Sequence, residues 1–273
     1  MLVRVPGQAL RNVIAEAAAA AEPGIAPLAA ATAGRRSALL LGQYLAHLGL
    51  GTQEQETDLH ADMLRAAVAA GVHVCIFKPH PGAGPAAVTR LKHQAFEAGV
   101  ELLVADTPVL AEVLFELLRP DVVVGCFSTR PATAKFVFDI PTVAVGTEAV
   151  LESLAPYENS NRIPLTIIDA VMNRGFPAPA DAADTPLRKD LQGLVDTVAY
   201  CMQSRNLAAQ HRDAADFLSS RLGTENMRYL KRRRLLKWDL PASLPAARPG
   251  KSVSGGRTAR RGAVRRLFGA MLR

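Results

Sequence analysis

Short apolar runs alternate with longer amphipathic segments from residue 37 onward. The apolar runs are four to six residues long and are bounded by glycine or polar residues, which is typical of buried strands. They cover residues 37–41, 73–77, 100–105, 121–125 and 142–145, and the helical segments after them cover 53–70, 85–98, 108–118, 132–138 and 147–154. This alternation predicts an α/β fold, a Rossmann-like parallel sheet with helices on both faces.

The segments outside this alternation divide the chain into three predicted parts. Residues 1–36 predict one helix, over 7–21, followed by a linker that contains proline and glycine. Residues 37–238 form the main domain, which ends in helical segments over 187–204 and 206–222 and a further candidate helix over 225–238. Residues 239–273 predict a basic, partly disordered tail with a short helix over 259–272.

Composition favours a cytoplasmic protein with a sizeable core. Of the 273 residues, 49% are hydrophobic, and no signal-peptide pattern or run of eighteen apolar residues is present. Three cysteines, Cys75, Cys126 and Cys201, are isolated, and two of them lie in or beside apolar runs, as small buried hydrophobes do. We therefore expect a reducing compartment and no segment that spans a membrane.

The net charge of +7 is unevenly distributed. Residues 228–273 contain fourteen Lys or Arg and one acid, Asp239, which leaves a net charge of −6 for the first 227 residues. The main domain is thus mildly acidic, and the basic tail could lie on an anionic membrane, bind nucleic acid or be a solvated end.

Polar residues and glycines gather after the predicted strands, where α/β sheets bind ligands. These groups are Gly42-Gln43, Lys78-Pro79-His80-Pro81, Asp106-Thr107-Pro108, Gly125-Cys126-Phe127-Ser128-Thr129 and Gly146-Thr147-Glu148. Lys78 and His80 each precede a proline, so both are expected to be extended. If their side chains point to the same place, the lysine and the histidine could bind an anion. The alternative interpretation is a tight turn with two exposed cations and no ligand.

Two further groups are candidates for the same ligand. Ser128 and Thr129 precede a predicted helix, so their hydroxyls and the free N–H groups could bind an anion, or they could simply cap the helix. Glu112 lies in the first turns of the predicted helix over 108–118 and could accept hydrogen bonds from ribose hydroxyls. The alternative for Glu112 is a favourable charge at a helix N-terminus on a solvated face.

The order and spacing of these motifs resemble a known family. Lys78-Pro79-His80-Pro81, followed 45 residues later by Cys126-Phe127-Ser128-Thr129, resembles the paired HP and serine motifs of bacterial sialyltransferases. With Gly42-Gln43-Tyr44, Glu112-Val113-Leu114 and residues 146–162, the set is most similar to the alpha-2,8-polysialyltransferase family, over about residues 37–170.

The resemblance implies a metal-independent, inverting sialyl transfer from CMP-sialic acid to a glycan or glycolipid acceptor, with no cofactor. It implies a two-domain GT-B fold, of which this chain looks like the C-terminal, donor-binding half. His80 would contact the phosphate and protonate the CMP leaving group, and Ser128 and Thr129 would hold the same phosphate. Lys78 and Pro81 would contact the cytidine, Glu112 its ribose, and Gln43 completes the expected substrate-binding set.

The chain departs from the family pattern in one respect. The family carries an acid-acid-glycine motif that supplies the general base, whereas Glu16 and Glu22 are the only acids before residue 37. No general base is assigned, and the alternative function is a non-catalytic nucleotide-sugar or anion-binding module without an acceptor domain. For the tail we favour peripheral contact with the inner membrane face, because enzymes that build polysaccharides often work there. Nucleic acid is not the expected partner, since stacking aromatics are few.

Overall fold

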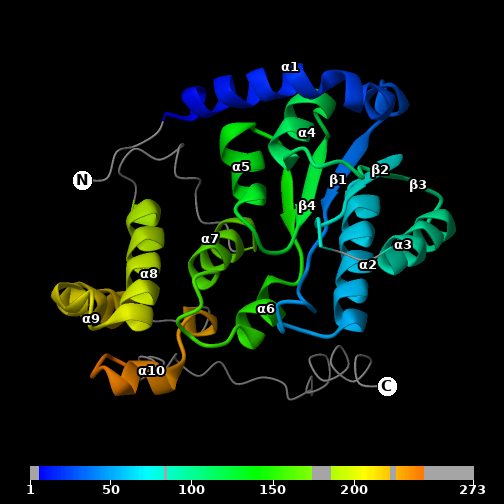
Figure 1. The fold of residues 1–273 in the computed structure, drawn as a ribbon. Coiled ribbons are helices and arrows are strands. Elements are labelled where there is room, and N and C mark those ends of the chain that lie inside the picture. Colours follow the sequence, from blue (N-terminus) through cyan, green and yellow to red (C-terminus); the bar gives the residue numbers. More distant parts are fainter. Residues whose placement is uncertain (1–5, 83–84, 174–185, 222–225, 243–273) are drawn as a thin grey trace, which may run out of the picture. The chain divides into compact units, whose positions relative to one another are not determined.

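The computed structural model describes residues 6–82, 85–173, 186–221 and 226–242 and contains a five-stranded parallel sheet (Figure 1). The strands are β1 (Ser37–Leu41), β2 (Val74–Lys78), β3 (Glu101–Val104), β4 (Val122–Gly125) and β5 (Thr142–Ala144). Their order is β3-β2-β1-β4-β5, so β1 is central and pairs with β2 on one side and β4 on the other. The α/β, Rossmann-like prediction is confirmed.

Helices cover both faces of the sheet. Alternate side chains of β1 enter different cores: Leu39 and Leu41 pack with α1, α4 and α5, whereas Ala38 and Leu40 pack with α2, α3 and the later helices. The helices are α1 (Gly7–Thr32), α2 (Gln53–Ala69), α3 (Pro85–Glu97), α4 (Ala111–Leu118), α5 (Arg130–Val137), α6 (Thr147–Ser153), α7 (Arg162–Asn173), α8 (Pro186–Gln203), α9 (His211–Arg221) and α10 (Arg232–Lys237). Two short 3-10 helices are η1 (Ala208–Gln210) and η2 (Asn226–Arg228).

Helix α1 is longer than predicted. The prediction ended the helix at residue 21 and placed a linker after it, but α1 continues to Thr32 through Pro23 and Pro27. A proline inside a helix removes one backbone hydrogen bond. Here burial offsets that loss, because Ile25 packs into the core that α4 and α5 share with the sheet, and α1 lies across these helices (Figure 1).

By length and composition, α1 also qualifies as a candidate membrane span, with a mean hydropathy of 1.3 in its most apolar window. No such segment was expected from the sequence, because no run of eighteen apolar residues occurs in it. In this structure Ile14 and Ala18 of α1 pack against Val113 of α4.

The remaining helices differ from the predictions mainly at their ends. Thr52 caps α2 as predicted, in a capping box with Gln55. Helix α4 begins at Ala111 rather than at residue 108, and Leu110 before it is extended. The single candidate helix over 225–238 is instead η2 and α10, separated where Tyr229 and Leu230 enter the core. The predicted tail helix over 259–272 lies outside the described residues.

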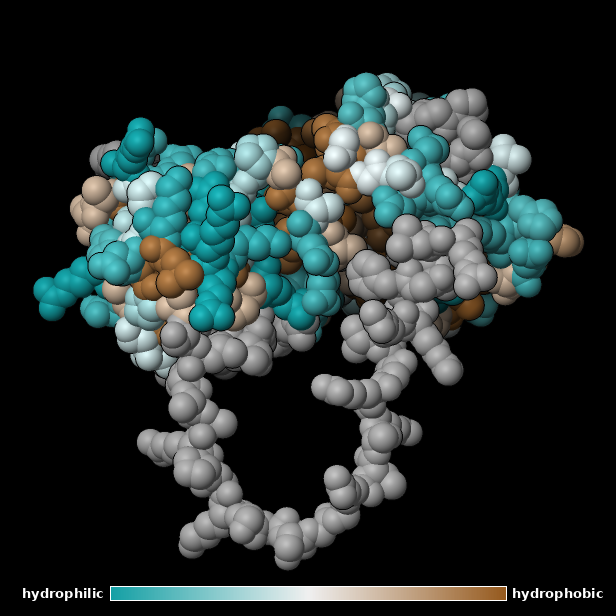
Figure 2. All heavy atoms as spheres, turned by 90° about the horizontal axis from the view of Figure 1, so that it is seen from below, coloured by the Kyte–Doolittle hydropathy of each residue, from teal (hydrophilic) through white to brown (hydrophobic). Residues whose placement is uncertain are grey.

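Helix α10 presents a basic surface. Arg232, Arg233 and Lys237 are exposed, and Leu236 between them is 63% exposed, whereas Leu235 is fully buried. Figure 2 views the molecule from below and shows mostly hydrophilic residues on the left, the side on which α10 lies in Figure 1. The basic residues of α10 are therefore accessible to an anionic partner.

Candidate functional site

The loop after β1 lies directly against the end of β2. The backbone N–H of Gly42 donates to the carbonyl oxygen of Lys78 at 2.9 Å. A Cβ atom on Gly42 would lie 2.8 Å from this oxygen and 3.0 Å from Cα of Pro79. Glycine is therefore required here for two backbone segments to approach each other, which places the loop beside the HP motif.

Gln43 joins the loop after β1 to the loop after β4. Its side-chain amide donates to the carbonyl of Leu41 at 2.6 Å and accepts from the N–H of Phe127 at 3.3 Å. Its backbone N–H donates to Nε2 of the buried His60 at 2.9 Å. Gln43 is itself buried, so the structure gives it a role in holding the two loops together, and its contact with substrate stays a prediction.

Lys78 is the last residue of β2 and is buried. Its Nζ donates to the carbonyl oxygen of Thr107, in the loop after β3, at 2.7 Å. Burial lowers the pKa of Lys78, the charge of Arg130 lowers it further, and the carboxylate of Asp106 opposes both effects. The predicted extended geometry of Lys78 is confirmed by its place in the strand.

His80 is half-buried and its ring is held from two directions. Nδ1 accepts a hydrogen bond from the N–H of Gly82 at 3.2 Å, which leaves the proton of the neutral ring on Nε2. The ring of Tyr44 stacks on it, with centroids 4.6 Å apart and planes inclined by 7°. Burial and the positive charge of Arg130 lower the pKa of His80, so the ring is mainly neutral at pH 7 when no anion is bound.

Ser128 and Thr129 lie at the start of α5 and differ in how they are used. Oγ of Ser128 accepts from the N–H of Arg130 at 3.1 Å, so the helix-capping alternative describes this residue in part. Thr129 is the N-cap residue, but its exposed side chain makes no capping hydrogen bond. The capping alternative therefore does not account for the hydroxyl of Thr129.

Arg130 is the residue that the sequence analysis missed. It is the first residue of α5, and its charge acts on both Lys78 and His80. Hydrogen bonds of the loop after β1 with Lys78 and with Phe127 place the HP motif and the Ser/Thr motif near each other at the carboxyl edge of the sheet. The helix was predicted to begin at residue 132, whereas α5 begins at Arg130, so the sequence did not place this arginine in the first turn.

A hollow of about 320 Å³ adjoins these cations. It is lined by Pro79, His80 and Pro81 after β2 and by Asp106, Thr107 and Pro108 after β3. Small-molecule sites have volumes of about 300–1,000 Å³, so the hollow can take one planar ring system and part of a sugar. Pro81 lies here, and its contact with cytidine stays a prediction.

Glu112 is half-buried in the first turn of α4, close in sequence to this hollow. Among the described residues, no hydrogen bond or ion pair links Glu112 to Lys78, His80 or Ser128. Its assignment to the ribose stays a prediction.

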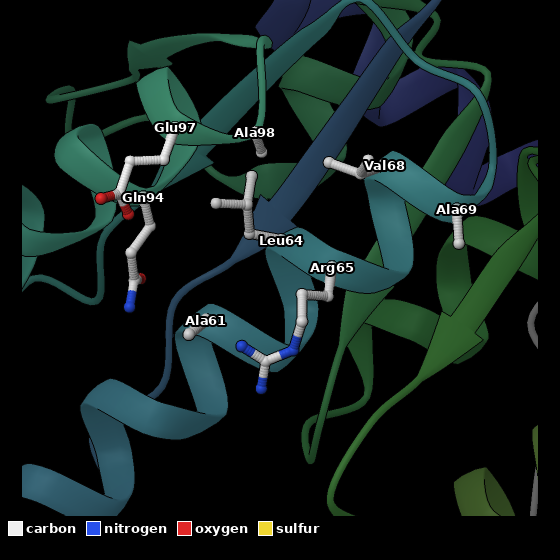
Figure 3. A pocket seen from close by; sticks show the side chains of 8 residues that line it. All are labelled: Ala61, Leu64, Arg65, Val68, Ala69, Gln94, Glu97 and Ala98. Carbon is white, nitrogen blue, oxygen red and sulfur yellow. The ribbon is translucent and has the colours of Figure 1, made fainter.

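A larger hollow, of about 620 Å³, lies between α2 and α3 (Figure 3). Its lining is mainly apolar, with Leu64 and Val68 from α2 facing Gln94 and Glu97 from α3. These residues belong to the second halves of the two helices, which lead back to the amino ends of β2 and β3. We place the site at the smaller hollow, because the polar strand ends and the cations are there.

The motif over residues 146–162 builds the support of this edge. Arg162 is fully buried and donates to the carbonyls of Leu154 at 2.7 Å and Tyr157 at 2.9 Å. Asp169 of α7 accepts from Thr147 at 2.6 Å and from the hydroxyl of Tyr229 at 2.6 Å. These buried contacts join α6 and α7 to the residue after η2 and account for Thr147 and Arg162 of the motif without a ligand.

Comparison with known proteins gives one family match. The model of the alpha-2,8-polysialyltransferase family (POLYST) matches residues 3–147, from the segment before α1 to the start of α6. No curated protein and no solved structure matches the chain. The match includes α1, which the resemblance over residues 37–170 had left out, and it includes every candidate site residue. The chain therefore belongs to the alpha-2,8-polysialyltransferase family, a family of sialyltransferase-like glycosyltransferases.

Proposed function

We propose that this chain binds CMP-sialic acid at the carboxyl edge of its sheet and transfers the sialyl group to a glycan or glycolipid acceptor with inversion. Family membership supports a nucleotide-sugar donor and a glycan acceptor in general. One observation carries the finer proposal: the charge of Arg130, beside Ser128-Thr129, acts on both Lys78 and His80 of the HP motif. Hydrogen bonds of Gly42 and Gln43 join the loops of the two motifs, so their cations gather at one edge of the sheet, which suits a phosphate.

The phosphate of CMP would lie between His80 and the start of α5. The hydroxyls of Ser128 and Thr129 and the guanidinium of Arg130 would donate to its oxygens, and charge-assisted hydrogen bonds of this kind are the strong ones. The cytosine would enter the hollow beside Pro81, above the ammonium group of Lys78. The ribose would then point toward α4 and Glu112.

In the transfer step, the acceptor hydroxyl oxygen forms a bond to the anomeric carbon, on the face opposite the phosphate. The bond from that carbon to the phosphate oxygen breaks, and its electron pair leaves with CMP. Nε2 of His80 gives its proton to this oxygen, and Arg130 stabilises the charge that develops. The proton of the acceptor hydroxyl goes to a base that we do not assign. Because protein cations meet the phosphate, we expect no requirement for a metal.

The low pKa of His80 suits this role. In the free protein the ring is mainly neutral, because burial and Arg130 oppose its positive form. A phosphate placed beside the ring favours the imidazolium, so donor binding would raise the pKa of His80 and load the acid. We therefore expect donor binding to take up protons near pH 7.

Calorimetry with CMP and UDP tests the donor, and release of CMP in the presence of a sialylated acceptor tests the transfer. We expect CMP to bind and UDP to bind weakly, and His80→Ala to reduce transfer about 100-fold while CMP affinity changes little. His93→Ala, at an exposed position of α3, is the control, and EDTA should not change the rate. Equal or absent binding of both nucleotides would overturn the donor assignment. Binding of CMP without transfer would favour the non-catalytic module.

We also propose that the basic end of the chain holds the protein at the cytoplasmic face of an anionic membrane. The exposed Arg232 and Arg233 of α10 support this proposal, and each cation near such a surface contributes about 1 kcal/mol. Co-sedimentation with phosphatidylserine vesicles should fall by about tenfold or more in the variant with Arg232→Glu and Arg233→Glu. Equal binding to phosphatidylcholine vesicles would contradict an electrostatic contact.

A further inference from the structure

The phenol ring of Tyr44 fills the space beside His80. Its centroid lies 4.6 Å from that of the imidazole, and the two planes are nearly parallel. A Cβ atom on Gly82 would lie 2.6 Å from Cζ of Tyr44 and 2.8 Å from its hydroxyl oxygen. Gly82 thus leaves room for the phenol ring and donates its own N–H to Nδ1 of His80.

These two contacts restrain different motions of the imidazole. Stacking on Tyr44 holds the plane of the ring, but a half-turn about the Cβ–Cγ bond would return the ring to the same plane and preserve the stack. The hydrogen bond from Gly82 to Nδ1 opposes this half-turn, because it would put the other edge of the ring against the N–H. Together they leave Nε2 as the nitrogen that can give up a proton.

Glu56 holds the turn that carries Tyr44. It lies in the first turn of α2, is only 2% exposed, and its Oε2 accepts from the N–H of Ala46 at 2.9 Å. His47 of the same turn also stacks on Tyr44, with centroids 4.4 Å apart. Burying a carboxylate costs free energy, and a neutral side chain could accept the same hydrogen bond. The cost suggests that the charge of Glu56 acts on a neighbouring group.

We propose that Tyr44 and Glu56 are positioning residues for His80: Tyr44 holds the plane of the imidazole, and Glu56 holds the turn that carries Tyr44. The inference rests on the proposed role of His80 as the acid. The charged groups that act on His80 come from three elements. Arg130 of α5 and His47 of the turn disfavour the imidazolium, and Glu56 of α2 favours it.

Three variants separate the two parts of this role. Tyr44→Leu removes the stacked ring and Tyr44→Phe keeps it, whereas Glu56→Gln removes the charge but keeps an oxygen that can accept from Ala46. Glu54→Gln, at an exposed position in the same turn of α2, is the matched control. The pKa and tautomer of His80 are read by nitrogen-15 NMR of the imidazole, and transfer kinetics are measured over a pH range.

We expect Tyr44→Leu to lower kcat about tenfold or more with little change in CMP affinity, and Tyr44→Phe to recover most of that loss. We expect Glu56→Gln to lower the pKa of His80 and to shift the alkaline limb of kcat, which reports the group that must be protonated, to lower pH; Glu54→Gln should do neither. An unchanged tautomer and kcat in Tyr44→Leu, or an unchanged pKa of His80 in Glu56→Gln, would overturn the proposal. If the unaltered protein shows no transfer, the proposed function fails by itself, and the NMR measurements still decide the positioning of His80.

Discussion

The backbone N–H of Gly42 donates to the carbonyl oxygen of Lys78, and no side chain fits between the two residues. This contact continues the pairing of β1 with β2 by one step beyond Leu41 and Lys78, the last pair of the ladder. It therefore brings the loop of Gln43 and Tyr44 against the HP motif. The relative position of this loop and the HP motif depends on the contact.

Replacing Gly42 by alanine should disturb the site more than the fold. The added Cβ would meet backbone atoms of Lys78 and Pro79, which must shift, at a cost of about 1–3 kcal/mol. We expect a lower midpoint of thermal unfolding and weaker CMP binding in calorimetry. Gly24→Ala in α1 is the control, because nothing lies within 4 Å of its new atom. Full CMP affinity in Gly42→Ala would show that the approach of the two loops is not needed.

Replacing Arg130 by glutamine should act on two other residues at once. Without the guanidinium, the pKa of His80 and that of Lys78 should both rise, because Arg130 lowers both. CMP affinity should fall about tenfold through the loss of a charge-assisted contact with the phosphate. Imidazole NMR and calorimetry measure the two effects, and Arg233→Gln on α10 controls for net charge. A fall in affinity with no change in the pKa of His80 would place Arg130 farther from the HP motif than we infer.

His60 should make the fold sensitive to acid. Its Nε2 accepts from Gln43, its Nδ1 has no hydrogen-bond partner among the described residues, and burial lowers its pKa from 6.5 to about 4. The unfolded chain therefore binds a proton between pH 6.5 and 4 that the folded chain does not. The free energy of unfolding is therefore not reduced by His60 above pH 6.5. It falls by about 3 kcal/mol as the pH decreases from 6.5 toward 4.

Urea unfolding of the protein and of the His60→Gln variant at pH 7 and pH 4.5 measures this effect. Glutamine can still accept from Gln43 but does not titrate, so the loss of stability between the two pH values should be smaller in the variant. His73→Gln, at an exposed position before β2, should keep the full loss. The same loss in all three proteins would assign the acid sensitivity to other groups.

Replacing Arg162 by methionine should destabilise the domain without touching the hollow. The carbonyls of Leu154 and Tyr157 would lose their buried donor, at a cost of about 3 kcal/mol, since an unsatisfied buried acceptor is expensive. Urea unfolding gives the difference in free energy, with Arg233→Met as the exposed control. A difference below about 1 kcal/mol would mean that water replaces the guanidinium.

Local signals predicted most of the sheet and its helices. The strands were predicted because each is a short apolar run that ends at a glycine or a polar residue. Thr52, as an N-cap residue, predicted the start of α2. The order of the strands could not be predicted in this way, because pairing β1 with β4 is a contact between residues far apart in the chain. The length of α1 was missed for the same reason: Pro23 and Pro27 are local signals for an end, and packing of Ile25 overrides them.

The site was predictable where chemistry and position coincide. Lys78 and His80 drew attention because a cation before a proline at a strand end is unusual, and both lie at the carboxyl edge. Gln43 was expected in the loop after β1, but its inward orientation depends on partners in β1 and in the loop after β4 that no local pattern shows. Arg130 escaped because an arginine in the first turn of a helix has no sequence signal until its neighbours in space are known.

The hydrogen bond between Gln43 and Phe127 joins residues 84 positions apart, because β2 and β3 lie in the chain between the neighbouring strands β1 and β4. During synthesis, β2 and β3 can pair with β1 as they emerge, but the candidate site at the carboxyl edge of the sheet is incomplete until β4 pairs with β1. CMP affinity would thus arise abruptly with chain length, and nascent chains arrested before residue 120 should not be retained on immobilised CMP.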